Sequence, residues 1–151
     1  MMGYNLSIGQ LITTIEADGL DSYIRNDVEF QHNEGAPAFG DMGDGTNSRY
    51  PSYVIWADCM WFVGLYDFMF SKDNGLIRDH PGCVLLTQEH KQMIDKAYTK
   101  FYAKYPNAKA GYPKDGENAP EENSCAVRLE WLKYWVDWAL VNCSKPVFVN
   151  S

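Results

Sequence analysis

The side chains best suited to chemistry stand together just before the first apolar helix that the sequence predicts. This segment carries amide, hydroxyl, phenol and guanidinium groups at Asn47, Ser48, Arg49, Tyr50, Ser52 and Tyr53. The N-terminal end of a helix offers free backbone N–H groups and favours anions. A guanidinium can hold a carboxylate or phosphate with two hydrogen bonds, and a tyrosine ring can stack on a planar group. We therefore predict a site for a small, planar, anionic ligand here. The alternative is a structural strap that caps the helix.

A second group with the same chemistry lies near the C-terminus. Arg128, Trp131 and Trp135 fall on one face of a predicted helix, because their spacing is three and then four residues. A guanidinium beside indole rings can hold a planar ligand or satisfy cation–π geometry. We include these three residues in the predicted ligand site. The alternative is an aromatic core with one buried ion pair.

Asp58 is an acid within a strongly apolar helical segment. A buried carboxylate without a partner is costly, so we predict that Asp58 is buried and meets Arg49 or Arg128. We also predict that Arg49 points into the protein. A different use of Asp58, together with a histidine or a metal ion, would be a small hydrolase.

The sequence shows no established catalytic pattern. It contains no HExxH motif and no phosphate-binding loop with a Gly-Lys-Ser/Thr ending. His80, Cys83 and His90 do not complete a zinc-site spacing. We therefore predict no catalytic residue, no metal site and no cofactor, and a protein that is not an enzyme.

Composition limits the classes of partner. The formal net charge of −7, from 13 Lys and Arg against 20 Asp and Glu, disfavours binding to DNA or RNA polymers. The one basic series is Lys91, Lys96, Lys100 and Lys104, which we interpret as a solvated helix face. The N-terminus lacks the pattern of a signal peptide, and no segment favours a membrane span. The four cysteines form no CxxC pair, which indicates reduced thiols in the cytoplasm.

The order of predicted elements indicates an α+β fold in a single domain, residues 1–151. Alternation predicts strands at 3–12 and 22–31, joined near the Asp18–Gly19 turn. Helices are predicted from Pro51 to about Gly64, from Thr87 to Pro106, and over 124–143, with loops at 71–86 and 107–123. The C-terminal KPVFVNS segment predicts a strand that joins the N-terminal hairpin in a small antiparallel sheet. The helix at 124–143 is apolar on most sides, which favours a homo-oligomer.

Several segments together resemble one group of proteins. These are MGYNLSIG near the N-terminus, TNSRYPSY followed by IWADC and VGLYD, HPGCVLLT, and LEWLKYWVDWALVNCSKPVFVNS at the C-terminus. In these segments the chain is similar to uncharacterised small soluble proteins that bacteriophages encode. The resemblance implies an accessory, anti-defence-like protein in the host cytoplasm that sequesters a nucleotide-derived immune signal. The alternative that it implies is a protein–protein module that inhibits a host enzyme.

Overall fold

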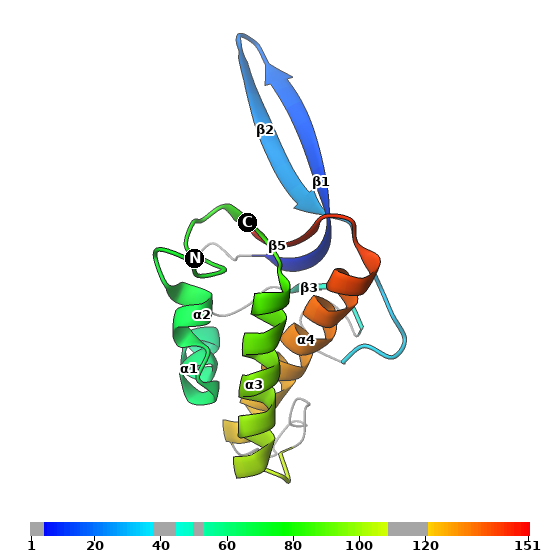
Figure 1. Ribbon diagram of the computed structural model, residues 1–151. Helices are drawn as coiled ribbons and strands as arrows, with labels where there is room; N and C mark the ends of the chain where they lie inside the picture. The colour runs from blue at the N-terminus through cyan, green and yellow to red at the C-terminus, as the bar shows by residue number, and fades with distance from the viewer. Residues whose placement is uncertain (1–4, 38–44, 50–52, 109–120) are drawn as a thin grey trace, which may run out of the picture.

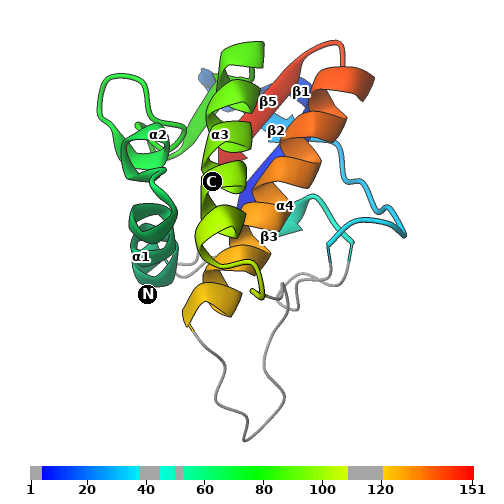
Figure 2. The ribbon, with the colours of Figure 1, turned by 60° about the horizontal axis from the view of Figure 1, so that its bottom comes forward.

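The computed structural model describes residues 5–37, 45–49, 53–108 and 121–151. An antiparallel sheet has its helices gathered on one side, which confirms the predicted α+β fold (Figures 1 and 2). Along the chain, the elements are β1 (Leu6–Asp18), β2 (Asp21–Val28), β3 (Ser48–Arg49), α1 (Tyr53–Val63), α2 (Tyr66–Phe70), β4 (Gly82–Leu85), α3 (Gln88–Lys104), α4 (Glu121–Asn142) and β5 (Pro146–Asn150).

Strand β1 is long enough to pair with different strands along its length. Its first half pairs with β5, from Leu6 opposite Asn150 to Gln10 opposite Pro146. Its second half pairs with β2. The sheet order is β2-β1-β5-β4, and β3 also pairs with β1. The prediction that the C-terminal strand joins the N-terminal hairpin is therefore confirmed.

The second half of β1 and all of β2 form a hairpin that projects from the rest of the molecule, at the top of Figure 1. We call residues 11–28 the arm. Its two-residue turn consists of Gly19, with φ of 63°, and Leu20 at negative φ. That combination matches the type II′ turn, which fits the twist of antiparallel strands and requires glycine at its first position. The predicted turn is thus confirmed.

Two helix ends follow local signals that the sequence contains. Gly64, with φ of 81°, ends α1: its N–H donates to the Trp61 carbonyl, and the Leu65 N–H donates to the Met60 carbonyl. This pair of bonds is the Schellman arrangement, which glycine favours. At the start of α3, the Thr87 hydroxyl accepts from the His90 N–H, and the His90 side chain accepts from the Thr87 N–H. Both boundaries were predicted.

Two short strands and one helix were not predicted. Residues 82–85 were predicted as loop but form β4, which pairs with β5. Strand β3 consists of two residues, and α2 is a helix of five residues that follows the predicted helix end at Gly64. The described part of the chain therefore contains four helices where about three were predicted. No helix within it has both the length and the apolar character needed to cross a membrane.

Helix α4 contacts α3, α1 and β1, and Figure 2 shows it beside α3 and in front of the sheet. Its broad apolar surface is covered within the chain, since Trp131, Leu132, Trp135 and Val136 are fully buried. The α3, α1 and β1 segments supply this cover. The apolar character of α4 therefore gives no reason to expect a subunit interface there. The predicted homo-oligomer needs a different basis.

Candidate functional site

Arg49 lies inside the protein, as predicted, with only 1% of its surface exposed. Its guanidinium carbon is 5.9 Å from the centre of the Trp56 ring and 5.7 Å from that of Trp131. The two indoles meet edge to face, with ring centres 6.1 Å apart. Trp131 also donates from Nε1 to the Thr46 carbonyl at 3.0 Å. We call Arg49, Trp56, Arg128 and Trp131 the inner cluster.

The two predicted arginines come together at Trp56. The Arg128 guanidinium carbon is 6.0 Å from the Trp56 ring, so both cations contact one indole. Arg128 also donates from Nη1 to the carbonyl and hydroxyl oxygens of Ser124, each at 2.8 Å. Trp135 is fully buried further along α4 and packs against Tyr134 and Trp138. The structure thus joins two groups that are 79 residues apart in sequence.

Asn47 has a structural role, but it joins parts of the sheet instead of capping the helix as the sequence alternative had it. Its amide is fully buried, donating to the carbonyls of Ile8 and Glu29 at 2.8 and 2.9 Å and accepting from the Gln31 N–H at 2.9 Å. These bonds join β1 to the segment that follows β2. Ser48 exchanges a hydrogen bond with Ser7 across the β1–β3 pair. Both polar groups therefore serve the sheet.

The prediction for Asp58 is wrong. Its side chain is exposed on α1, whereas Trp56, Cys59, Met60 and Val63 form the buried side of that helix. A carboxylate in water needs no partner, so the reasoning that linked Asp58 to Arg49 or Arg128 fails. Among the residues that the structure describes, no group of three or more His, Cys, Asp or Glu side chains is placed to hold a metal ion.

The remaining predicted site residues divide into two groups. Tyr53 is half-buried at the start of α1, where its ring meets Phe70 edge to face. Tyr50 and Ser52 lie outside the described residues. The predicted site thus corresponds mainly to the buried centre of the molecule, and its use by a ligand stays a prediction.

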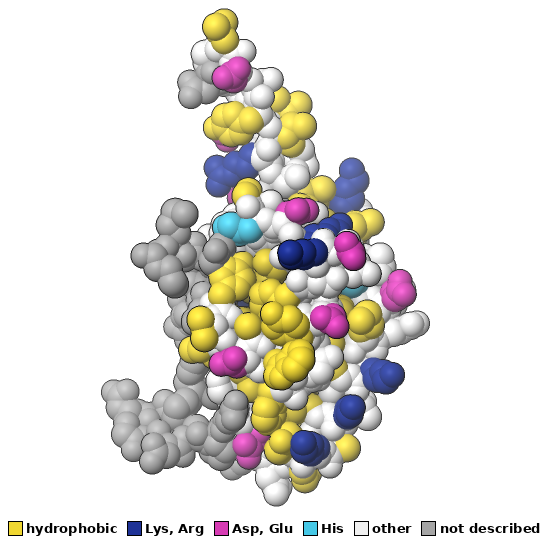
Figure 3. Space-filling view, turned by 90° about the vertical axis from the view of Figure 1, so that its left-hand side faces the viewer, with side chains coloured by type: hydrophobic (Ala, Val, Ile, Leu, Met, Phe, Trp, Pro, Cys, Tyr) yellow, Lys and Arg dark blue, Asp and Glu magenta, His cyan; other side chains and the backbone are white. Residues whose placement is uncertain are grey.

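A different set of cations and aromatic rings lies at the surface, between α1 and α3. A groove of about 600 Å³ opens there, and we call it the lysine groove. Its lining includes Lys96, Lys100 and Lys104 along α3, with Trp61, Phe62 and Tyr105 among its aromatic residues. Figure 3 views the side of the molecule where α1 and α2 lie, and it shows apolar side chains gathered over the body with Lys and Arg side chains beside them.

The three lysines form a straight row. Their spacing of four residues places them on one side of α3, with a rise of about 6 Å between neighbours. All three are exposed, and none is within ion-pair distance of an acid among the described residues. The ammonium of Lys104 lies 5.4 Å from the Tyr105 ring centre. The row therefore concentrates positive charge on a protein whose net charge is −7.

Aromatic rings from α1, the start of α2 and the end of α3 border this row. Phe62 and Tyr105 stack with their ring centres 5.2 Å apart. Trp61 is 73% exposed and contacts Tyr66 edge to face at 5.3 Å. A large exposed indole that is already held by a neighbouring ring can stack on a ligand with little loss of freedom. Flat aromatic surface and a cation row thus meet in one groove.

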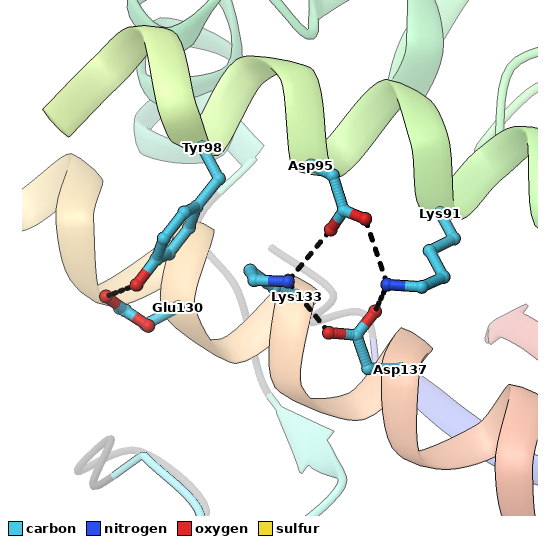
Figure 4. Close-up of polar contacts among 6 residues, drawn as sticks. All are labelled: Lys91, Asp95, Tyr98, Glu130, Lys133 and Asp137. Carbon is cyan, nitrogen blue, oxygen red and sulfur yellow. Dashed lines mark hydrogen bonds and ion pairs between the residues drawn. The ribbon is translucent and has the colours of Figure 1, made fainter. Parts of the chain in front are cut away.

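Polar contacts to α4 determine which side of α3 faces the groove. Figure 4 shows Lys91 and Lys133 each bound to both Asp95 and Asp137, with all four distances between 2.8 and 3.0 Å. Next to this ring of ion pairs, Tyr98 donates to the Glu130 carboxylate at 2.9 Å. These contacts hold one side of α3 against α4. The lysines of the groove occupy the other side.

The same ring of ion pairs shifts the pKa values of Asp95, Lys133 and Lys91. Hydrogen bonding from Lys133 lowers the pKa of Asp95; desolvation opposes this shift, and Lys91 adds to it. Desolvation would lower the pKa of Lys133, but its hydrogen bonds to Asp137 and Asp95 raise it overall. The hydrogen bonds that Lys91 donates to Asp95 and Asp137 also raise the pKa of Lys91. These shifts favour the charged forms of Asp95, Lys133 and Lys91.

Sequence reasoning missed the lysine groove for two reasons. The lysine row has the same pattern as an ordinary solvated helix face, and Trp61 belongs to a helix whose composition suggested burial on most sides. One signal was available: Lys96, Lys100 and Lys104 share a side of the helix that Lys91 does not. Searches of protein-family models, curated proteins and solved structures find no match to this chain.

Proposed function

We propose that this protein is a non-enzymatic binder that sequesters a small nucleotide-class ligand in the lysine groove. The observation that carries this proposal is the row of three lysines beside the exposed Trp61. A nucleotide combines a planar base, which can stack on the aromatic side of the groove, with phosphate oxygens, which can bind the lysines. This proposal keeps the predicted class of ligand and places it at different residues.

The spacing of the lysines favours a ligand with more than one anionic group. Neighbouring ammonium groups start from backbone positions about 6 Å apart, and flexible side chains can bring them onto adjacent or separated phosphates. A single carboxylate would use only part of the row. We therefore expect triphosphates or cyclic dinucleotides to bind more tightly than monophosphates.

The aromatic side of the groove would hold the base. Stacking of a base on an aromatic side chain contributes about 1–3 kcal/mol and tolerates different bases. Trp61 offers its surface to solvent, whereas Trp56, Trp131 and Trp135 are fully buried. Trp138 is half-buried and does not line the groove, so a tryptophan fluorescence change on binding would report on Trp61.

Calorimetry with the intact chain tests the proposal. The ligands are nucleoside mono- and triphosphates, cyclic dinucleotides, inorganic triphosphate and uncharged nucleosides. We expect nucleotides with several phosphates to bind most tightly. Inorganic triphosphate should bind more weakly because it has no base to stack on the aromatic rings, and nucleosides because they have no phosphate for the lysines. Absence of binding by every nucleotide would overturn the proposal.

Matched variants locate the binding. Replacing Lys96 and Lys100 with glutamine should weaken nucleotide binding by more than about tenfold, since a hydrogen bond to a charged group contributes about 1.5–3 kcal/mol. The control replaces Lys72 and Lys145, which are exposed but do not line the groove, with glutamine. Equal losses in both double variants would indicate attraction by general charge and contradict the assignment to the groove.

The resemblance to phage proteins supplies the setting of this proposal. A phage accessory protein of this kind would act in the host cytoplasm by holding a nucleotide-derived signal. Sequestration requires binding without turnover. Recovery of unchanged nucleotide after long incubation is the expected result, and hydrolysis that Asp58→Asn abolishes would favour the hydrolase alternative.

A further inference from the structure

The two faces of the arm differ in charge. Direct cross-strand partners in an antiparallel pair point to the same face. The register therefore puts eight residues on one face: Leu11, Thr13, Ile15, Ala17, Ser22, Ile24, Asn26 and Val28. None of them is charged. Glu16, Arg25 and Asp27 belong to the opposite face, where the Tyr23 hydroxyl donates to Glu16 at 2.5 Å.

The charge-free face is open to solvent for most of its length. Ile15 and Ile24, which are direct partners, are 75% and 67% exposed. Leu20 is exposed at the turn. A hairpin that projects alone buries little apolar surface, and exposed apolar side chains gathered on such an element mark interaction surfaces.

The base of this face is continuous with the side of the sheet that faces away from the helices. Leu11 and Val28 pack with Val147, Val149 and Cys83 in a small apolar cluster separate from the main core. Beside this cluster lies a cleft of about 800 Å³, between β2 on one side and β4 with the end of β5 on the other. We call it the arm cleft. Its lining includes the apolar side chains of Ile24, Cys83 and Val149, and also the charged residues Arg25, Asp27 and Asp79.

Charge indicates what can cover this surface. Two copies of a chain with net charge −7 repel each other wherever their acids meet. The charge-free face brings no acid to the contact, so it can lie against the cleft of a second copy, where Asp27 and Asp79 accompany Arg25, without acids of the two copies meeting. Contact between the same surface on both copies also gives a closed twofold dimer. A second copy therefore fits this face, whereas a basic partner would choose the face with Glu16 and Asp27.

Area decides how the two copies would meet. Eight residue pairs at about 3.3 Å each make a ribbon about 26 Å long, and two strands make it about 10 Å wide. One face of the arm thus offers about 260 Å², against the roughly 800 Å² per partner that a stable dimer needs. Contact between two arms alone falls well short. Placing each arm in the cleft of the other copy adds the cleft surface and the edge of β2.

We infer that this chain forms a twofold dimer in which the arm of each copy lies in the arm cleft of the other. The contact involves the charge-free face of the arm and the apolar cluster beneath it. It is separate from the lysine groove, so it does not depend on the proposed nucleotide binding. It also gives the expected homo-oligomer a basis other than α4.

Sedimentation of the full chain tests the dimer. We expect a dimer at micromolar concentration, and we expect Ile24→Asp to raise the dissociation constant by more than about tenfold. Ile12→Asp makes the same change on the charged face of the arm and should leave the dimer intact. A wild-type monomer at high micromolar concentration would overturn the inference, as would an Ile24→Asp variant that dimerises like the wild type.

Folding and arrangement need separate measurements. Circular dichroism and nucleotide binding show whether each variant is folded, since neither depends on the dimer. For the arrangement, Ala17→Cys on the charge-free face should cross-link oxidatively to Cys83 of the other copy, whereas Thr14→Cys on the opposite face should not. Adding Cys83→Ser should remove the cross-link. A cross-link that survives this change would mean that the arms meet each other, and the arm-in-cleft arrangement would be wrong.

Discussion

The inner cluster and the lysine groove contain the same kinds of group in opposite surroundings. Both bring cationic side chains beside aromatic rings. In the inner cluster, Arg49 and Trp131 are enclosed, so their interaction stabilises the fold. In the groove, Lys100 and Trp61 face water, so their surfaces remain available. Exposure, rather than residue type, separates a structural cation–aromatic contact from a candidate binding site.

The largest effect that tests this comparison is expected at Arg49. Arg49→Ala should lower the free energy of unfolding by about 3 kcal/mol or more, because it leaves a cavity between two indoles and removes their cation–π contacts. Urea denaturation measures the loss. Lys100→Ala in the groove should stay within about 0.5 kcal/mol of wild type. If the two variants unfold alike, the inner cluster is not structural.

A smaller loss of about 1.5–3 kcal/mol is expected for Trp131→Phe. Phenylalanine keeps an aromatic ring but cannot donate to the Thr46 carbonyl, which would lose a bond of 3.0 Å in the interior. Thermal unfolding followed by circular dichroism provides the measurement. The matched change Trp61→Phe should leave the melting temperature almost unchanged while weakening nucleotide binding. A reversed order of stabilities would remove the distinction between the two regions.

The ion pairs between α3 and α4 are expected to contribute less. Lys133→Met should cost about 1 kcal/mol at neutral pH, since partly exposed pairs are screened by solvent and contribute little each. The loss should be accompanied by weaker nucleotide binding, because the variant loosens the contact that orients the lysine row. Lys72→Met is the control, and it should change neither property.

This contribution should depend on pH in a defined direction. The pKa of Asp95 is lowered in the folded state, so its stabilising effect is complete above the unfolded value of about 3.9 and is lost as pH falls through the lower folded value. The pKa of Lys91 is raised, so its effect is complete below about 10.5 and is lost as pH rises further. Wild type and Lys133→Met should therefore approach equal stability in strong acid. A constant difference at all pH values would contradict the ion-pair explanation.

The smallest expected effect is on the quenching of tryptophan fluorescence, which is measured without any change in stability. Iodide should quench mainly Trp61, because three of the other tryptophans are fully buried and the lysine row attracts an anion. Trp61→Phe should remove most of the quenching by iodide. Neutral acrylamide should quench Trp61 with a weaker dependence on salt, since it is not attracted by charge. Equal quenching before and after the substitution would mean that another tryptophan is accessible.

Local features of the fold could be predicted because short stretches of sequence determine them. Gly64 ends α1 since its backbone takes a positive φ, and Thr87 begins α3 by accepting a hydrogen bond three residues ahead. The type II′ turn is also determined locally, because its first position requires the positive φ that Gly19 adopts. Strand β4 was missed because its four residues gain order only by pairing with β5.

The candidate site could be predicted only in part. The inward position of Arg49 followed from its neighbours, but the burial of Asp58 was inferred from the average composition of α1. That helix has one buried side, and Asp58 is on the other. Composition does not distinguish the sides of a helix that is apolar nearly all around. Which side is covered depends on where α4 and the sheet lie.

The sequence by itself determined the α+β class, the positions of the main helices and the turn of the arm, because these follow from periodicity and from residues with special backbone preferences. Only the tertiary structure decided that Arg49 and Arg128 meet at Trp56 and that three lysines face Trp61 across a groove. Both outcomes depend on packing between elements far apart in sequence. Packing sets the exposure of each side chain, and exposure decides whether a cation beside an aromatic ring stabilises the protein or remains free to bind.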